Sequence, residues 1–298
     1  MYSEIAANKR KTWLLVACVS ALLIALIWVV GRSYGLDNAT SLGAGALFSF
    51  VYGLFSWFTS APIALAASGA KEVTKAQAPE LYNVVENLCI ANGQPLPKIY
   101  VIDDDSPNAF ATGRDPKHAS IAFTTGILRI MTKPELEGIA AHELSHVKNY
   151  DIRVMTIVVV LVGAIMLIGN LFLRANIFGG KRDSDNRVGM IFMVIGLALA
   201  ILSPVIAQLI NFAVSRKREY LADASGALLT RYPDGLASAL AKLAANNQPL
   251  RAANHATAHL FIANPFGASG KTRSFIANLF ATHPPIEERI ARLKSMGV

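Results

Sequence analysis

The chain has 298 residues, of which 53% are hydrophobic and only 16% are charged, with a formal net charge of +8. Ordinary soluble proteins carry about 25% charged residues, so this composition indicates a membrane protein. The positive charge does not indicate nucleic-acid binding, because the basic residues flank apolar runs and no nucleic-acid recognition motif is present. Two cysteines provide no disulfide framework, which fits a soluble part that faces a reducing compartment.

Two apolar stretches near the N-terminus are each long enough to cross a bilayer. The first, residues 12–31, contains no charge and follows the basic cluster at 9–11. It is longer than the hydrophobic region of a typical signal peptide and lacks an Ala-x-Ala cleavage site, so we interpret it as a signal anchor. The second, residues 38–70, is also uncharged. Residues 1–70 are therefore expected to form two transmembrane helices that return the chain to its starting side.

From about Lys71 the composition becomes that of a soluble domain. Residues 78–91 have the apolar spacing of an amphipathic helix. Two strands are expected at 98–103 and 118–125, with the segment 108–113 between them. A small sheet of this kind can accept a peptide substrate as an additional strand, although it could equally be a plain structural hairpin.

The stretch His142-Glu143-Leu144-Ser145-His146 matches the pattern H-E-x-x-H. Residues four apart lie on the same face of an α-helix, so both imidazoles can reach one zinc ion while Glu143 stands beside a metal-bound water. Thr132 and Glu135 have the spacing of a capping box, which predicts that the helix begins there. The alternative interpretation is a pair of histidines on a solvated helix face.

Two further uncharged runs, 154–173 and 188–215, follow this helix and are separated by a basic link at 174–187. Four spans would place both termini and the H-E-x-x-H helix on one side of the membrane. The basic clusters at 9–11 and 216–218 favour the cytoplasm for that side, whereas the basic link counts against it. Alternatively, the two later runs form a hydrophobic hairpin that covers the enzyme without crossing completely.

A catalytic zinc site needs three protein ligands and an open position for water, so a third ligand must be found. Glu219 is the strongest candidate. Asp223, four residues later on the same helical face, can accept a hydrogen bond from the far nitrogen of a ligating histidine. The same pair would also suit a solvated charged face. His255 and His259 are four apart but lack an intervening glutamate, and we expect them at the surface of a loop-like region, 250–275.

These residues predict peptide hydrolysis. Zinc would polarise the scissile carbonyl and acidify its bound water, and Glu143 would take the proton from that water and pass one to the leaving amine. The oxyanion of the tetrahedral intermediate needs a further donor. His283 and Arg289, at the start of a terminal helix, are the candidates, although a helix cap and an ion pair would also explain them.

Taken in this order and interrupted by apolar runs, the motifs resemble those of the HtpX family of bacterial membrane-bound heat-shock metalloproteases, and more distantly those of the CAAX prenyl proteases. The resemblance rests on the segments 108–111, 142–146, 218–223 and 283–289. It implies an α-helical membrane protein with an α+β zincin-like (gluzincin) catalytic domain. About four transmembrane helices and a small β-sheet beside the H-E-x-x-H helix are expected.

The catalytic domain is expected in two parts, 71–153 and 216–298. The apolar region 154–215 would form two transmembrane helices, or a hairpin, between them.

The resemblance also implies roles for individual residues. One zinc ion would be held by His142, His146 and Glu219. Glu143 would be the catalytic acid and base, with His283 and Arg289 near the oxyanion. The substrate-binding edge would consist of Asn108, Ala109, Phe110, Ala111 and Thr112.

In that family the enzyme faces the cytoplasm from the inner membrane and cuts misfolded or damaged membrane proteins. The expected partners are therefore the lipid bilayer and unfolded polypeptides, with no nucleic acid. Two alternatives stay open: a peptidase that matures prenylated or lipid-anchored substrates, and a non-catalytic scaffold or chaperone stabilised by zinc. Glu143 argues against the scaffold, because a structural zinc site needs no base and usually has four protein ligands.

Overall fold

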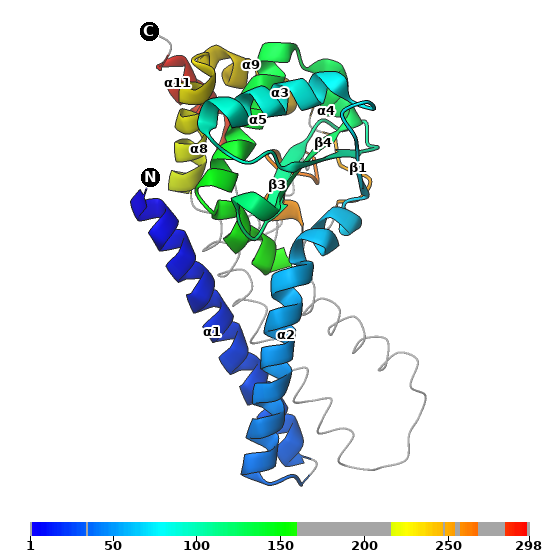
Figure 1. Cartoon of the computed structure of the whole chain (residues 1–298), viewed down its shortest axis with the longest axis vertical. Helices are drawn as coiled ribbons and strands as arrows, with labels where there is room; N and C mark the ends of the chain where they lie inside the picture. The colour runs from blue at the N-terminus through cyan, green and yellow to red at the C-terminus, as the bar shows by residue number, and fades with distance from the viewer. Residues whose placement is uncertain are drawn as a thin grey trace.

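Two long helices stand as a hairpin beneath an α+β head in the computed structural model of the chain (Figure 1). The structure describes residues 2–33, 35–159, 216–246, 248–253, 257–267 and 284–296. The later apolar runs from residue 160 to 215 lie outside the described residues, as do His255 and His283. Of the four expected membrane helices, the two N-terminal ones therefore lie within the described residues.

The hairpin consists of α1 (Tyr2–Ser33) and α2 (Asn38–Ala67). Both are long and apolar enough to cross a membrane, in agreement with the predicted N-terminal pair. Asp37 begins α2 by accepting a hydrogen bond from the Thr40 amide at 2.9 Å, which satisfies one of the free N–H groups of the first turn. The helices approach closely because α2 presents small residues to α1. A Cβ atom added at Gly45 would lie 3.0 Å from the Ile24 Cα.

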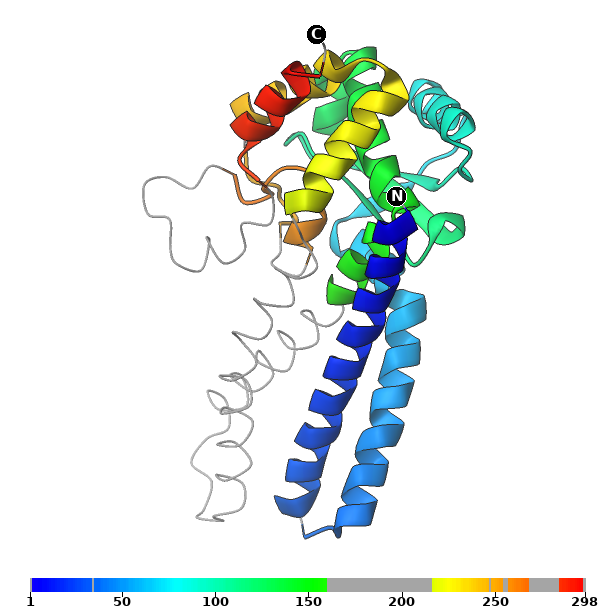
Figure 2. The same ribbon diagram turned by 90° about the vertical axis from the view of Figure 1, so that its left-hand side faces the viewer.

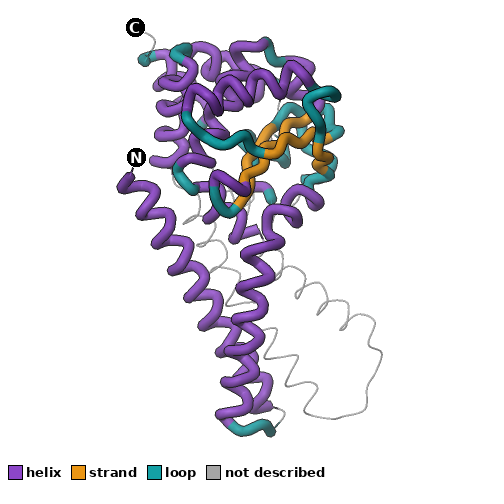
Figure 3. Tube along the Cα trace, in the orientation of Figure 1, coloured by secondary structure: helices purple, strands orange, loops and turns teal. Residues whose placement is uncertain are grey.

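The head contains a four-stranded mixed sheet with the order β1-β2-β4-β3, shown in orange in Figure 3. Its strands are β1 (Ala70–Glu72), β2 (Lys98–Ile102), β3 (Ala109–Gly113) and β4 (Ala119–Thr124). The parallel pair is β2 and β4, whereas β3 runs antiparallel to β4 and forms one edge.

The predicted strands correspond to β2 and β4, and the sequence did not reveal the other two. All five residues of β3 are buried, so its sequence shows no alternation of apolar and polar residues that would predict a strand. The strand β1 has only three residues, too few for a recognisable pattern.

The helices of the head surround α5 (Lys133–Lys148), which carries the H-E-x-x-H residues. The other elements are α3 (Pro79–Asn92), η1 (Pro116–His118), α4 (Thr125–Ile130), α8 (Arg216–Thr230), α9 (Pro233–Ala245), η2 (Ala258–Leu260) and α11 (Ile286–Lys294). The predicted helices at 78–91 and at the C-terminus correspond to α3 and α11. Helices α8 and α9 are separated by a turn in which Arg231 adopts a positive φ of 54°.

Helix α5 is the centre of the main apolar core. Its Leu136, Ile139 and Leu144 pack in one cluster with side chains from α3, the sheet and α9. Gly138 allows α9 to come unusually close, since a Cβ atom there would lie 2.7 Å from the Leu236 amide nitrogen. The capping box is present as predicted, with the Glu135 carboxylate accepting the Thr132 amide at 2.7 Å. Burial on all sides holds the two histidines of α5 rigidly in place.

Candidate metal centre

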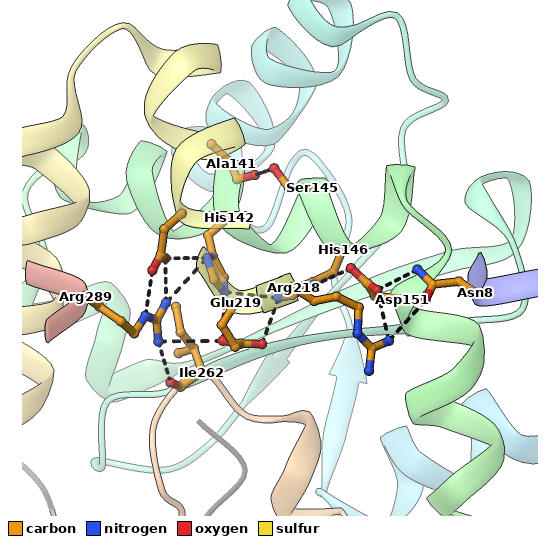
Figure 4. A network of polar contacts seen from close by, with 11 residues as sticks. Asn8, Ala141, His142, Ser145, His146, Asp151, Arg218, Glu219, Ile262 and Arg289 are labelled. Carbon is orange, nitrogen blue, oxygen red and sulfur yellow. Dashed lines mark hydrogen bonds and ion pairs between the residues drawn. The ribbon is translucent and has the colours of Figure 1, made fainter. Parts of the chain in front are cut away.

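Two helices bring together the three residues predicted to bind metal. His142 and His146 lie one turn apart on α5, and Glu219 comes from α8 (Figure 4). The three are the only group of His, Cys, Asp or Glu among the described residues that is arranged to hold a metal ion, with ligand atoms within 4.8 Å of one another. Their exposed fractions are 1%, 4% and 2%. The interpretation of these histidines as a solvated helix face is therefore wrong.

The distances suit a tetrahedral ion. The two Nε2 atoms lie 3.2 Å apart, and the Glu219 carboxylate oxygens lie 3.8 Å from His142 Nε2 and 3.5 Å from His146 Nε2. Two nitrogen ligands at zinc-like bond lengths in a tetrahedral arrangement are separated by about 3.3 Å. The two nitrogens and one carboxylate are therefore compatible with a common divalent cation.

A glycine on α8 sets the position of Glu219. A Cβ atom added at Gly226 would lie 3.1 Å from the backbone nitrogen and 3.3 Å from the Cα of His142. A side chain at this position would force α8 and α5 apart by a few tenths of an ångström. Because Glu219 is on the same helix as Gly226, this contact determines how far its carboxylate reaches toward the histidines.

Each histidine is oriented by a second carboxylate. Asp223 Oδ1 lies 2.9 Å from His142 Nδ1, and Asp151 Oδ2 lies 3.1 Å from His146 Nδ1. A hydrogen bond at Nδ1 turns the Nε2 atom of the same ring toward the metal position. The structure thus places Asp223 where the sequence predicted it. Asp151 was missed, although an aspartate just past the end of the helix, five residues after His146, was the available signal.

Arg289 is fully buried and contacts both Asp223 and Glu219. Its Nε and Nη2 atoms donate to the two Asp223 oxygens at 2.9 and 2.7 Å, and its Nη1 atom lies 3.8 Å from Glu219 Oε2. Nη1 also lies 3.5 Å from the carbonyl oxygen of Ile262. The ion pair considered in the sequence analysis is therefore present, and Arg289 lies within reach of a metal ligand.

The charges around His146 favour a cation. Burial disfavours the charged imidazole, but the Asp151 hydrogen bond and the carboxylates of Glu219 and Glu143 outweigh that effect and raise the pKa of His146 to about 9. A site that stabilises one positive charge so strongly is chemically suited to a divalent cation bound to neutral histidines.

The remaining groups complete the electrostatics of the site. Burial raises the pKa of Asp223, yet the Arg289 charge and the bond to His142 hold it down at about 2. Glu143 is 2% exposed, and its charge contributes to raising the pKa of both His146 and Arg289. Glu143 therefore lies beside the metal ligands, as a general base requires.

The predicted substrate edge lies along β3, an edge strand that the segment around Ile262 and Ala263 partly covers. The Ile262 amide donates to the Ala109 carbonyl at 3.0 Å. The Asn108 side chain holds the backbone of Ala263 on both sides, since Nδ2 donates to its carbonyl at 3.0 Å and Oδ1 accepts its amide at 3.2 Å. The strand lies against the H-E-x-x-H helix, because Ala111 packs in one cluster with Val147.

The expectation of surface histidines is wrong for His259. This residue is 1% exposed, and its Nε2 atom lies 2.8 Å from the Met155 carbonyl oxygen. It is buried because the segment around η2 packs against β3, with Phe261 edge-on to Phe110 at 5.0 Å. Residues 257–262 of the predicted surface loop are therefore buried in the head, whereas Arg251 and Ala252 are exposed.

Comparisons with known proteins agree with this geometry. The sequence profile "Peptidase family M48" matches residues 75–297. A protease HtpX homolog of Dictyoglomus thermophilum is 46% identical over 99% of this chain and 95% of its own length. Another from Tropheryma whipplei strain Twist is 48% identical over 100% of this chain and 99% of its own.

A solved structure shares the fold. The crystal structure of S. mikatae Ste24p matches with a TM-score of 0.52 and 21% identity, covering 98% of this chain and 67% of that one. At this identity the likeness concerns the fold alone. The sequence profile and the full-length relatives together show that the chain belongs to peptidase family M48, as a membrane metalloprotease of the HtpX type.

Proposed function

We propose that the chain is a zinc endopeptidase that cuts misfolded or damaged membrane proteins as part of protein quality control. The observation that carries the proposal is the convergence of His142, His146 and Glu219 on one buried position beside Glu143. Two nitrogens and one carboxylate are the donor set of catalytic rather than structural zinc sites, which use four protein ligands. Neither alternative is favoured, since the full-length relatives are named as HtpX-type proteases.

The protein residues have distinct tasks in the proposed reaction. Bound zinc supplies a Lewis acid for the scissile carbonyl and lowers the pKa of a water molecule. The Glu143 carboxylate accepts the proton of that water and returns one to the leaving nitrogen. Asp223 and Asp151 keep the two histidines oriented. For the oxyanion we propose Arg289, whose guanidinium lies 3.8 Å from Glu219, together with His283.

The edge strand β3 is the proposed place for substrate, along Asn108 to Thr112. The Ala109 carbonyl points away from β4 and accepts a hydrogen bond from Ile262. In an antiparallel ladder outward-facing groups recur at every second residue, so the backbone of Ala111 also points away from β4. An extended peptide can pair there, next to the helix that carries the metal ligands.

The proposed location is the inner membrane, with a multi-pass chain and the head in the cytoplasm. The N-terminus lies at the level of the head, whereas the turn between α1 and α2 lies at the far end (Figure 2). The basic cluster at 9–11 is therefore on the same side as the head, and such clusters favour the cytoplasm. Trp13 and Trp57 stack at 6.1 Å between centroids, and Arg153 lies over Trp57 at 5.1 Å, as expected at a membrane surface.

We retain the division of the catalytic domain proposed from the sequence. Its two parts are 71–153 and 216–298, and the region 154–215 supplies two further membrane helices or a hairpin between them.

A reconstituted system tests the role in quality control. The purified protein and a Glu143→Gln variant are placed in liposomes with a small membrane protein, in a stable form and in a form destabilised by a core substitution. We expect the wild type to cut the destabilised form at least several times faster, and the variant to cut neither. Equal cleavage of both forms would contradict quality control. Cleavage restricted to a prenylated peptide would instead favour the processing peptidase.

A further inference from the structure

Helix α1 does more than anchor the chain. We propose that Asn8, on this membrane helix, is a positioning residue of the metal site that acts through Asp151 on His146. The inference rests on the proposed function, since it concerns the same metal ligands. It concerns a residue outside the region 75–297 that the family profile matches.

Asn8 is a buried polar residue on α1. It is 1% exposed, whereas the next two residues, Lys9 and Arg10, are exposed. Its Nδ2 atom donates to Asp151 Oδ1 at 2.7 Å (Figure 4). The same atom donates to the Asn149 carbonyl at 2.8 Å. Both amide hydrogens are therefore directed at the end of the H-E-x-x-H helix.

These bonds fix the orientation of the Asp151 carboxylate. Oδ1 accepts from Asn8 and also from Arg218 Nη1 at 3.1 Å. With Oδ1 held by two donors, Oδ2 is left facing His146 Nδ1 at 3.1 Å. The rotation of this carboxylate is thus determined by residues from α1 and α8, and it in turn sets the direction of the His146 ring.

The two histidines are supported in different ways. The carboxylate beside His142 is held by Arg289 through two hydrogen bonds. The carboxylate beside His146 receives one bond from an arginine and one from the neutral amide of Asn8. The Asn8 amide thus orients the Asp151 carboxylate without placing a second positive charge close to the metal position. Removing it leaves a buried carboxylate oxygen with one donor fewer, which is costly when no water replaces it.

Asn8 also completes the end of α5. Asn149 is the C-cap of this helix, and carbonyl groups of the last turn lack partners within the helix. The Asn8 amide satisfies the Asn149 carbonyl and so fixes the path of the chain into Asp151. The same side chain therefore positions both the backbone and the carboxylate that support His146.

The test compares zinc affinity of the full-length, detergent-solubilised protein by chelator competition. Asn8→Ala removes the two hydrogen bonds that Nδ2 donates and the weaker one that Oδ1 accepts from Arg218 Nη1 at 3.4 Å, and Asn8→Leu removes them while keeping the side-chain volume. The matched control is Thr12→Ala, because Thr12 is equally buried one turn further along α1 and, within the described part of the chain, its side chain bonds only to the Asn8 carbonyl of its own helix, at 2.9 Å. Among the described residues, no hydrogen bond joins the Thr12 side chain to Asp151.

We expect both Asn8 variants to bind zinc about three- to tenfold more weakly, because partners beyond the metal ligands typically change affinity by about 10- to 100-fold when they contact a ligand directly. Thr12→Ala should stay within about twofold of wild type, well below that range. The visible spectrum of the cobalt-substituted protein should shift in the Asn8 variants only, since it reports ligand geometry. A helix that merely docks would not change this spectrum.

A double-mutant cycle identifies the route. If Asn8 acts through Asp151, adding Asn8→Ala to Asp151→Asn should weaken zinc binding no further. Additive losses, or wild-type affinity with an unchanged cobalt spectrum in both Asn8 variants, would overturn the inference while leaving the metal site intact. A wild-type protein that binds no zinc would instead show that the proposed metal site is wrong, and the inference would fall with it.

Discussion

Glu135 links the beginning of the H-E-x-x-H helix to α9. The loss of stability on its replacement by glutamine can be calculated from the structure. The Glu135 side chain is 7% exposed. It accepts hydrogen bonds from the Lys242 ammonium and the Ser238 hydroxyl, both at 2.6 Å, and from the Thr132 amide at 2.7 Å. Glu135→Gln removes the charge but keeps the size of the side chain.

The pKa of Glu135 provides the magnitude. Burial raises it, but the bonds from Lys242, Ser238 and Thr132 outweigh burial and lower the pKa from 4.5 to about 2. A shift of this size corresponds to about 3 kcal/mol of stability at neutral pH. The Lys242 side chain is 36% exposed, so solvent screening reduces the expected loss for Glu135→Gln to about 1–2 kcal/mol.

The sign of the pH dependence follows from the lowered pKa. The stabilisation is complete above the unfolded pKa of 4.5 and is lost as the pH falls toward about 2. The melting temperature of metal-free protein in detergent should therefore be about 2–6 °C lower in Glu135→Gln at pH 7, and the difference should shrink to less than half by pH 3.

Glu137→Gln is the control for this experiment. Glu137 lies on the same helix, and its side chain makes no hydrogen bond or ion pair with any other residue that the structure describes. Its substitution should leave the melting temperature unchanged at both pH values. A Glu135→Gln deficit that persists undiminished at pH 3, or that is absent at pH 7, would refute the reasoning.

Three further predictions concern the metal centre. Glu219→Ala should lose most of its zinc in a metal analysis, and full retention would mean that another residue is the third ligand. Gly226→Ala brings a Cβ atom to 3.1 Å from the His142 backbone nitrogen and should push α8 away from α5. Because Glu219 moves with α8, we expect zinc binding to weaken about tenfold in chelator competition. Normal affinity would show that the close contact is not required. Arg289→Lys keeps the charge but loses the paired bonds to Asp223 that orient the guanidinium, and peptide turnover should fall about 10-fold or more, whereas wild-type turnover would contradict the proposed role of Arg289 at the oxyanion.

Local patterns made part of the site predictable. His142 and His146 are fixed relative to each other by helix periodicity, and the capping box at Thr132 located the beginning of their helix. Glu219 and Asp223 could be proposed because they share one face of a single helix. Each of these inferences needs only residues that are close in sequence, and the structure brings all four side chains together as expected.

The features that the sequence did not reveal depend on contacts between distant segments. Asn8 meets Asp151 across 143 positions of the chain, and nothing in the spacing of either residue indicates the other. His259 was expected at the surface because its neighbourhood is rich in small polar residues, yet packing against Phe110 and Met155 buries the segment. The strand at 109–113 is covered on both faces, so no alternation marked it.

The measurement that tests the central claim most directly combines metal content with proteolysis. Wild-type protein and Glu143→Gln are purified in detergent, analysed for zinc, and assayed for casein cleavage with chelator and zinc add-back. The account predicts about one zinc ion per chain in both proteins, and cleavage only by the wild type, abolished by chelator and restored by zinc. Cleavage by Glu143→Gln at the wild-type rate would contradict the assignment of Glu143 as the base.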